Sequence, residues 1–207
     1  MAALIGLLGG TFDPVHNGHL AVARDLLETL GADSVRLILN AVPPHRTHPE
    51  CPVGHRLAML EAATTADHRL IPDTRELERI GPSYSVWTLR ALRRDFPEAS
   101  LFWIVGIDAW LGLERWYRWY ELSSLAHFLV VKRPGWELCP NAAARLSQDA
   151  DALRRRSSGA RVLWDGPGID VSASGIRRRI ASGEDVSQLV PEPVQRYIQC
   201  NRLYGYR

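Results

Sequence analysis

Cysteine is scarce in this chain of 207 residues, which contains only three. Cys51, Cys139 and Cys200 lie far apart, and no two cysteines form a CxxC pair. This pattern argues against a disulfide-bonded scaffold and against a zinc ribbon, and it is typical of a reducing compartment. We therefore expect a cytoplasmic protein.

Long apolar runs and a strong charge bias are missing as well. No apolar run approaches the roughly 20 residues that span a bilayer. Residues 1–10 are apolar and carry no basic residue, which indicates a buried first strand rather than a signal peptide. The net charge of +2 is too small to indicate a nucleic-acid-binding surface. We expect neither a membrane nor a nucleic acid as a partner.

The composition that remains is that of an ordinary globular protein. Hydrophobic residues make up 46% of the chain and charged residues 23%, both near the averages of soluble proteins. The length suits one domain with a real core, and no internal repeat or linker divides it. We expect a single domain over residues 1–207, with a small helical segment near 171–207.

Short apolar segments alternate with amphipathic ones along the chain. The apolar segments predict strands at residues 3–8, 34–39, 101–105, 128–131 and 162–164. The amphipathic segments predict helices at 19–30, 53–65 (with Leu57, Ala58 and Leu60 in the core), 83–94, 141–156, 174–181 and 193–199. Because the strands lack polar alternation, we expect an α/β fold: a Rossmann-like, doubly wound parallel sheet with helices on both faces. Ligands of such sheets bind at the carboxyl ends of the strands, where the strand order reverses.

The most informative stretch, residues 9–19, lies between the first strand and the first helix and reads GGTFDPVHNGH. Its glycines let backbone amides approach a ligand, and the helix that follows offers unpaired N–H groups. His16 and His19 are three residues apart, so both can face one anion, and Gly18 leaves the space between them open. Two such histidines could be ordinary surface residues, but their position after GGTFDP favours a polyphosphate site. Neither GxxxxGK[ST] nor GxGxxG is present.

A second candidate anion site lies near the C-terminus. Arg177 follows Ser174 by three residues at a predicted helix start and so repeats the pattern of the first motif. The alternative is an ordinary exposed arginine. We expect the neighbouring Arg178 and Arg179 to be solvated.

These motifs resemble those of the nucleotidyltransferase superfamily with a (T/H)xGH motif, and within it the bacterial nicotinate-nucleotide adenylyltransferases. The resemblance extends over nearly the whole chain, and its segments are GGTFDPVHNGHL at 9–20, PPHR at 43–46, SYSVWTL at 83–89, GID at 106–108, WY at 116–117, RPG at 133–135, VSASGIR at 171–177 and VPEPV with YI within 190–198. Three positions depart from the family pattern: Ser85 and Ser174 replace threonine, and Trp87 stands where many members have aspartate.

The resemblance implies a nucleotidyltransferase fold and transfer of the adenylyl group of ATP to nicotinate mononucleotide, giving nicotinate adenine dinucleotide and pyrophosphate in NAD biosynthesis. It makes His16 and His19 the catalytic residues, acting as hydrogen-bond donors to the phosphates. The ATP-binding residues it implies are Gly9, Gly10, Thr11, Phe12, Gly18, Gly106, Asp108, Ser172, Ser174 and Arg177. Those for nicotinate mononucleotide are Asp13, His45, Arg46, Tyr84, Ser85, Trp116, Tyr117 and Arg133.

Several of these residues have a second interpretation. Asp108 is expected either to accept a hydrogen bond from the ribose or adenine of ATP or to serve only as a helix N-cap. Trp116 is expected either to stack on the pyridine ring or to belong to the core. His45 could instead fix its loop, Arg46 could close over the phosphates or be solvated, and Asp13 could shape the turn.

We expect Mg²⁺ as the cofactor, bound mainly through the phosphates of ATP, and no metal site made by the protein alone. Alternative functions are adenylyl transfer to nicotinamide mononucleotide or another phosphate-bearing acceptor such as phosphopantetheine, or nucleotide sensing without turnover. An RNA-binding protein related to the class I tRNA synthetases is disfavoured by the short, nearly neutral chain. The oligomeric state is left open between monomer and homodimer.

Overall fold

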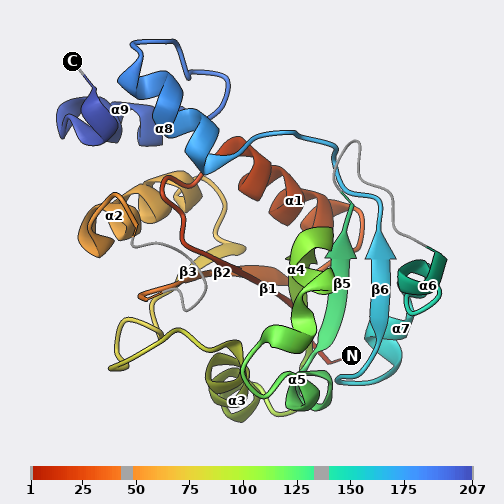
Figure 1. Ribbon diagram of the computed structural model, residues 1–207. Coiled ribbons are helices and arrows are strands. Elements are labelled where there is room, and N and C mark those ends of the chain that lie inside the picture. Colours follow the sequence, from red (N-terminus) through yellow and green to blue (C-terminus); the bar gives the residue numbers. More distant parts are fainter. Residues whose placement is uncertain (1, 43–48, 133–139, 207) are drawn as a thin grey trace.

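The structure, a computed structural model, describes residues 2–42, 49–132 and 140–206. It contains a six-stranded sheet in the order β3-β2-β1-β4-β5-β6, in which all five pairs of neighbours are parallel (Figure 1). The strands are β1 (Leu4–Gly10), β2 (Ser34–Leu39), β3 (Leu70–Asp73), β4 (Ser100–Gly106), β5 (His127–Val131) and β6 (Arg161–Trp164). The order reverses between β1 and β4, as in a doubly wound fold, and the predicted fold class is confirmed.

Helices connect the strands and form the C-terminal segment. They are α1 (Asn17–Glu28), α2 (Val53–Thr64), α3 (Ser85–Asp95), α4 (Ile107–Leu111), η1 (Leu113–Arg115), α5 (Trp119–Leu125), α6 (Pro140–Ala143), α7 (Ala152–Arg155), α8 (Ala173–Ala181), α9 (Glu192–Cys200) and η2 (Leu203–Gly205). Among the residues described, no helix combines the length and the apolar character that crossing a bilayer requires.

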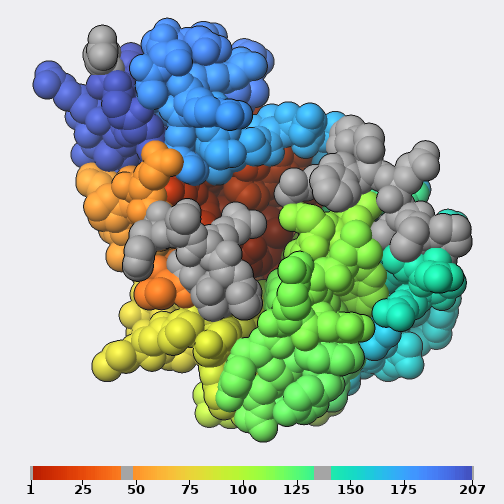
Figure 2. Space-filling view, in the orientation of Figure 1, coloured from red at the N-terminus to blue at the C-terminus, as the bar shows by residue number. Residues whose placement is uncertain are grey.

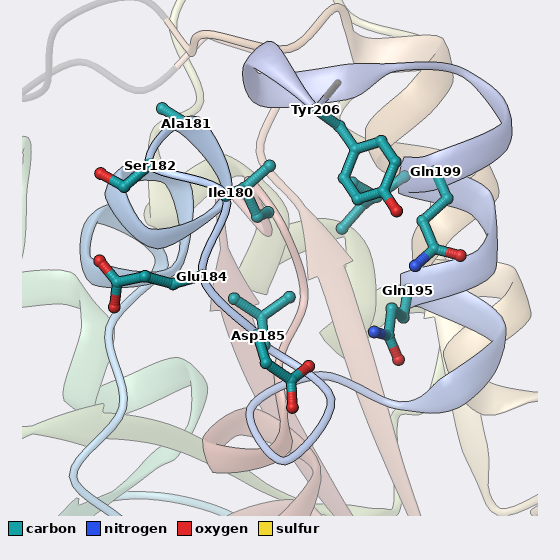
Figure 3. Close-up of a pocket in the computed structure, with 11 residues that line it drawn as sticks. Ile180, Ala181, Ser182, Glu184, Asp185, Gln195, Gln199 and Tyr206 are labelled. Atoms are coloured by element: carbon teal, nitrogen blue, oxygen red, sulfur yellow. The ribbon is translucent and has the colours of Figure 1, made fainter.

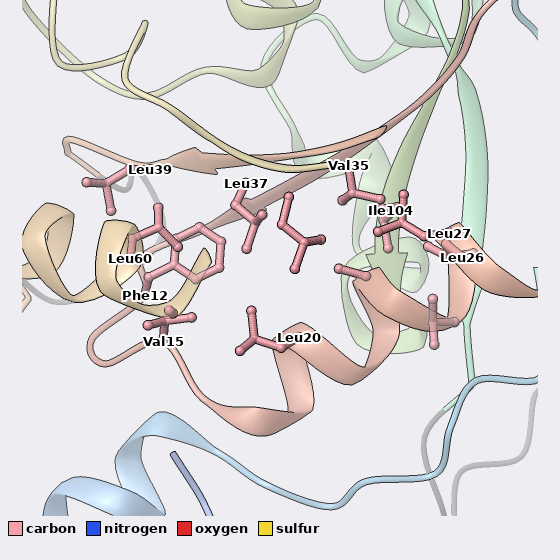
Figure 4. Packing of buried hydrophobic residues seen from close by; sticks show 14 of the residues in the cluster. Phe12, Val15, Leu20, Leu26, Leu27, Val35, Leu37, Leu39, Leu60 and Ile104 are labelled. Carbon is pink, nitrogen blue, oxygen red and sulfur yellow. The ribbon is translucent and has the colours of Figure 1, made fainter. Parts of the chain in front are cut away.

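Alternate residues of each strand feed two separate cores, because successive side chains of a strand point to opposite faces. In β4, Phe102 and Ile104 join the core beneath α1, α2, α8 and α9, whereas Leu101, Trp103 and Val105 join the core beneath α3, α4 and α5. Figure 4 shows the first core between α1 and the sheet. Both faces of the sheet are therefore covered, which explains why the strands lack polar alternation.

One local prediction is wrong, and a second holds only in part. The single helix predicted over 141–156 is replaced by the short helices α6 and α7, because Ser147 between them pairs with the edge strand β6: its N–H donates to Arg161 O (2.8 Å) and its carbonyl accepts from Leu163 N (2.8 Å). In α2, Leu60 lies in the core and Leu57 packs against it, as predicted, whereas Ala58 is only partly buried. The deeply buried side chains of this helix also include Arg56, Met59, Ala63 and Thr64.

Strand β3 and the helices between β4 and β5 were not predicted. Strand β3 has four residues, including Pro72, and lies at the sheet edge, the position where proline is tolerated.

Candidate active site

The predicted phosphate loop leaves β1 at the point where the strand order reverses, next to the loop that leaves β4. Figure 2 shows this face hollowed between α2 (orange), α8 (blue) and the segment around α4 (green), with N-terminal residues (dark red) at the floor. This is where parallel sheets bind ligands, and the loops meet there as the sequence predicts.

Close packing explains the glycines of this loop. A Cβ on Gly9 would lie 3.0 Å from the Trp103 ring, and one on Gly10 would lie 2.9 Å from the Phe12 ring. Phe12 has a φ of 49°, in the left-handed region, and its side chain is buried in the first core. The ATP contact predicted for Phe12 can therefore involve only its backbone.

His16 and His19 lie at the start of α1 with their rings stacked, 3.7 Å between centroids and 22° between planes. The backbone N–H of His16 donates to the ring atom Nδ1 of His19 (3.3 Å). A neutral His19 that accepts at Nδ1 carries its proton on Nε2, which makes Nε2 the donor. A Cβ on Gly18 would lie 3.1 Å from His16 Nδ1, so a side chain at this position would crowd the histidine ring, as predicted.

The first turn of α8 lies beside the first turn of α1. The same Cβ on Gly18 would lie 3.7 Å from Val171 Cβ, one residue before the Ser172 that caps α8. The hydroxyl of Ser172 accepts from Gly175 N (3.2 Å), and Ser174 is exposed in the first turn. Two helix N-termini, both favourable for anions, thus meet at the predicted phosphate site.

Arg177 points from α8 into this junction. Its Nη1 donates to Asp13 O (2.9 Å), and its Nε lies 2.7 Å from Glu50 Oε1. The side chain is only 21% exposed, so the alternative of an ordinary solvated arginine is wrong. Arg178 and Arg179 are exposed, as predicted, and line a hollow beside α8 together with Ser172.

Asp13 is a buried structural hub. Its Oδ2 accepts from Glu50 N (2.8 Å), and its Oδ1 accepts from the Tyr204 hydroxyl (2.8 Å). Burial, with the Asp13 charge nearby, raises the pKa of Tyr204. Both oxygens of Asp13 thus accept hydrogen bonds from the protein, which supports its role in shaping the turn more than contact with a mononucleotide.

Arg56 is a buried cation that sequence reasoning missed. Its guanidinium donates to Thr11 O (2.7 Å), Asn40 O (2.9 Å) and Cys51 O (3.2 Å), and so ties the carboxyl ends of β1 and β2 together. Burial lowers its pKa. Helical periodicity could have revealed it, because positions 56, 60 and 63 share the apolar face of α2.

The predicted acceptor residues gather around the start of α3. Ser83, just before it, accepts from Ala41 N (3.0 Å) and donates from its own N–H to Val42 O (2.9 Å), so this helix start is fixed to the chain that leaves β2. Tyr84 caps α3 and Ser85 is its first residue. The N–H groups of such a first turn suit a carboxylate.

Aromatic side chains from two elements meet beside this helix start. Tyr117 is exposed, and its ring stacks on Tyr84 with 4.6 Å between centroids. Trp116 is half-buried and packs against the second core, as the core interpretation predicts, and its stacking on the pyridine ring stays a prediction. Asp108 is exposed, and its carboxylate forms no hydrogen bond within the described chain; Gly106, not Asp108, caps α4, which excludes the N-cap interpretation.

Glu76 is a second buried carboxylate near α3. The Thr88 hydroxyl donates to its Oε1, and Arg79 lies 3.7 Å away, but Oε2 is buried without a hydrogen bond to the described residues. Burial raises the pKa of Glu76. No motif marks this residue in the sequence.

Three predicted contacts, His45, Arg46 and Arg133, lie outside the described residues. In the ranges that are described, no three His, Cys, Asp or Glu side chains gather into a site that could hold a metal ion.

A separate cavity of about 480 Å³ lies between α8 and α9 (Figure 3). Glu184 and Asp185 line it together with Gln195 and Gln199. Acidic side chains repel phosphate, so this cavity is unsuited to a nucleotide and does not compete with the site at the sheet.

Comparison with known proteins agrees with this geometry. A family model described as cytidylyltransferase-like matches residues 7–179. A probable nicotinate-nucleotide adenylyltransferase of Aeromonas salmonicida is 42% identical over 210 residues, which cover 99% of this chain and 98% of the relative. One of Pseudomonas putida is also 42% identical, over 97% of this chain and 94% of the relative.

Solved structures share the fold. The nicotinic acid mononucleotide adenylyltransferase of Plasmodium falciparum, complexed with NaAD, superposes with a TM-score of 0.78 at 15% identity and covers 99% of this chain and 98% of its own. A putative nicotinate-nucleotide adenylyltransferase of Vibrio parahaemolyticus gives a TM-score of 0.68 at 14% identity, over 98% and 95% of the two chains.

Proposed function

Because this chain belongs to the nicotinate-nucleotide adenylyltransferases of the cytidylyltransferase-like family, we propose that it transfers the adenylyl group of ATP to nicotinate mononucleotide. The observation that carries this proposal is the meeting of the α1 and α8 N-termini at the reversal of strand order, with His16, His19 and Arg177 around it. The products are nicotinate adenine dinucleotide and pyrophosphate.

The reaction needs no general base. An oxygen of the acceptor phosphate, already an anion at neutral pH, forms a bond to the α-phosphorus of ATP. The bond between that phosphorus and the oxygen bridging to the β-phosphate breaks, and its electron pair leaves with pyrophosphate. Catalysis then consists of positioning the reactants and stabilising the charge that develops.

The residues at the junction suit this task. His16 and His19 donate hydrogen bonds to the α- and β-phosphates, and the proton on His19 Nε2 is held there by the bond that Nδ1 accepts. Arg177 contributes a cation to the β- and γ-phosphates. Its hydrogen bond to Asp13 O holds it at the loop before ATP arrives.

We propose Mg²⁺ as the cofactor, held mainly by the phosphates of ATP and by water, as this ion prefers. The donor set fits this arrangement, because both oxygens of Asp13 already accept bonds from the protein and the described residues include no three-ligand cluster. The ion would neutralise charge on the phosphates.

The start of α3 is suited to the carboxylate of the acceptor. The helix N-terminus at Ser85 presents N–H donors, and Trp116 and Tyr117 supply aromatic rings nearby. A carboxylate accepts from such donors with charge-assisted bonds about twice as strong as neutral ones. An amide would bring its own N–H groups against them and leave a buried group badly paired.

Pyrophosphate release from ATP and Mg²⁺, measured with nicotinate and nicotinamide mononucleotide in parallel, tests the proposal. We expect kcat/KM for the nicotinate form to be higher by at least about 100-fold, which corresponds to about 2.7 kcal/mol for one mispaired group. Phosphopantetheine serves as a third acceptor.

Each result has a distinct meaning. A ratio near one between the two mononucleotides would contradict the assignment of the acceptor pocket and leave adenylyl transfer standing. Release with none of the acceptors would contradict catalysis and favour a nucleotide sensor. We place the reaction in the cytoplasm, because the odd number and wide spacing of the three cysteines are typical of a reducing compartment.

A further inference from the structure

We infer that Trp87 is a positioning residue for the acceptor site: its indole ring ties α3 to the turn that carries Trp116 and Tyr117. This inference rests on the proposed function. Trp87 lies in the first turn of α3, two residues after Ser85, and its side chain is 36% exposed. A tryptophan so exposed contributes little to the core, so its contacts on the surface carry the inference.

Two guanidinium groups lie over the Trp87 ring. The Cζ atom of Arg90 is 4.7 Å from the ring centroid, and that of Arg118 is 5.9 Å away. Arg90 belongs to the next turn of α3 on the same helix face, whereas Arg118 immediately precedes α5. Trp87 therefore connects α3 to the 116–119 turn through attraction between each cation and the ring face.

Glu121 closes the same network from the other side. Its carboxylate pairs with Arg90 and with Arg118, whose Nε lies 2.6 Å from Glu121 Oε1. Each of the two arginines thus contacts both the Trp87 indole ring and the Glu121 carboxylate. An arginine side chain held by two partners has fewer accessible conformations than a solvated one. The network of Trp87, Arg90, Arg118 and Glu121 therefore fixes α5 and the turn before it relative to α3.

The turn needs this support because of its backbone. Arg118 has a φ of 53°, in the left-handed region that non-glycine residues seldom adopt. The preceding residue, Tyr117, stacks on Tyr84 at 4.6 Å and lies 6.2 Å from the Trp87 ring centroid. Trp87 thus contacts two successive residues of the turn, and we expect the position of Tyr117 beside Tyr84, and of Trp116 before it, to depend on the indole ring.

The phosphate side shares none of these contacts. Its residues come from the β1–α1 loop and from α8, and they are held by Asp13 and its partners. Loss of the Trp87 ring should therefore weaken binding of the mononucleotide and leave ATP binding unchanged. A general loss of stability would affect both substrates.

The experiment compares Trp87→Ala, Trp87→Phe and Trp87→Asp in the full chain, with each substrate varied while the other is saturating. We expect Trp87→Ala to raise KM for nicotinate mononucleotide about 10-fold, because two exposed cation–π contacts of about 0.5–1 kcal/mol each no longer hold the turn in its binding position before the ligand arrives, with KM for ATP and kcat nearly unchanged. Trp87→Phe should restore most of the loss because it keeps an aromatic face. Trp87→Asp should restore part of it, since a carboxylate there can pair with the same two arginines.

Trp119→Ala is the matched control, because Trp119 is 38% exposed at the start of α5 and makes no ring stacking or cation–π contact within the described chain. It should leave both KM values unchanged.

The inference is overturned if Trp87→Ala leaves the KM for nicotinate mononucleotide unchanged, raises both KM values alike, or has an effect that Trp119→Ala matches. Inactive wild-type protein would overturn the proposed function and this inference with it, whereas active wild type with an unaffected Trp87→Ala overturns the inference alone.

Discussion

On the phosphate side of the site, the buried carboxylate of Asp13 accepts hydrogen bonds from Glu50 N and from the Tyr204 hydroxyl, and its backbone carbonyl accepts from Arg177. On the acceptor side, the buried carboxylate of Glu76 has one oxygen bonded to Thr88, while its other oxygen has no hydrogen bond of good geometry within the described chain and has the Ser83 side chain and Arg79 nearby. Two carboxylates with similar burial are thus fully hydrogen-bonded in one region and less completely hydrogen-bonded in the other.

The rest of each region follows the same division. Arg56 fixes the phosphate loop through buried bonds to main-chain carbonyls, whereas the acceptor side relies on the half-buried ring of Tyr84, the exposed rings of Trp87 and Tyr117, and surface ion pairs. Stabilising charge during bond breaking requires donors that do not move, while recognition of a ring tolerates adjustment. We expect changes on the phosphate side to act on turnover and ATP, and changes on the acceptor side to act on stability and acceptor binding.

The largest effect should come from the histidines. His16→Ala and His19→Ala should each lower kcat by roughly 100- to 1,000-fold, the scale for removing one preorganised donor to a developing charge. The loss should exceed any rise in KM, because the bonds strengthen in the transition state. Steady-state kinetics and circular dichroism test this, with the exposed His68→Ala as the control. Near-normal turnover in either variant would remove that histidine from catalysis.

A smaller effect is expected at Arg177. Arg177→Ala should weaken ATP binding about 10- to 100-fold, the range for a lost hydrogen bond to a charged group, and affect the mononucleotide far less, because only ATP carries the outer phosphates. Isothermal titration with both ligands measures this. Arg178→Ala, one residue away and exposed, should have little effect. Equal losses in the two variants would reduce Arg177 to a general surface charge.

Much of this arrangement could be predicted from local sequence. The strand over Ser34–Leu39 matches its prediction at both ends, and the loop between β1 and α1 was found from its glycines and histidines. These features depend on neighbours along the chain: an apolar run, a helix start, a glycine beside a ring. The roles assigned to His16, His19, Ser174 and the acceptor residues stay predictions.

The contacts that hold the site together could not be predicted in this way. The bond between Asp13 and Tyr204 joins residues 191 positions apart, and that between Arg177 and Asp13 joins residues 164 apart. No local pattern encodes such partners. The prediction of one helix over 141–156 was wrong for the same reason, because pairing of Ser147 with β6 overrides the local preference for a helix.

Substitution of Glu76, unlike the substitutions above, should make the protein more stable. Burial raises its folded-state pKa above the unfolded value, so the folded protein loses stability as pH rises from about 4.3, the usual glutamate pKa, through the raised pKa. Glu76→Gln cannot ionise and should be more stable than wild type by about 1 kcal/mol at pH 8, the low end of the cost of an unpaired buried group. The advantage should vanish toward pH 4. Urea unfolding at several pH values measures it.

Asp13→Asn provides the contrasting variant, because its amide would place N–H groups against the donors of Glu50 or Tyr204. It should destabilise the fold by about 1–3 kcal/mol at pH 8. The contrast between the regions would fail if both substitutions shifted stability in the same direction.

The smallest effect is expected at Glu50, and its sign is the most informative. The Glu50 carboxylate is 59% exposed and pairs with Arg177, so it competes with phosphate for that cation. Glu50→Gln removes the competing charge and keeps the backbone N–H that holds Asp13. We expect ATP to bind two- to five-fold more tightly, since a partly exposed ion pair contributes about 0.2–1 kcal/mol.

Titration calorimetry should show that the gain in ATP affinity shrinks at high salt and disappears in an Arg177→Ala background. Glu184→Gln, which alters the exposed carboxylate facing Arg179 at 4.0 Å, is the control and should change nothing. Weaker ATP binding by Glu50→Gln would mean that this carboxylate assists the nucleotide or its Mg²⁺, and the arginine would then be oriented by Glu50 rather than restrained by it.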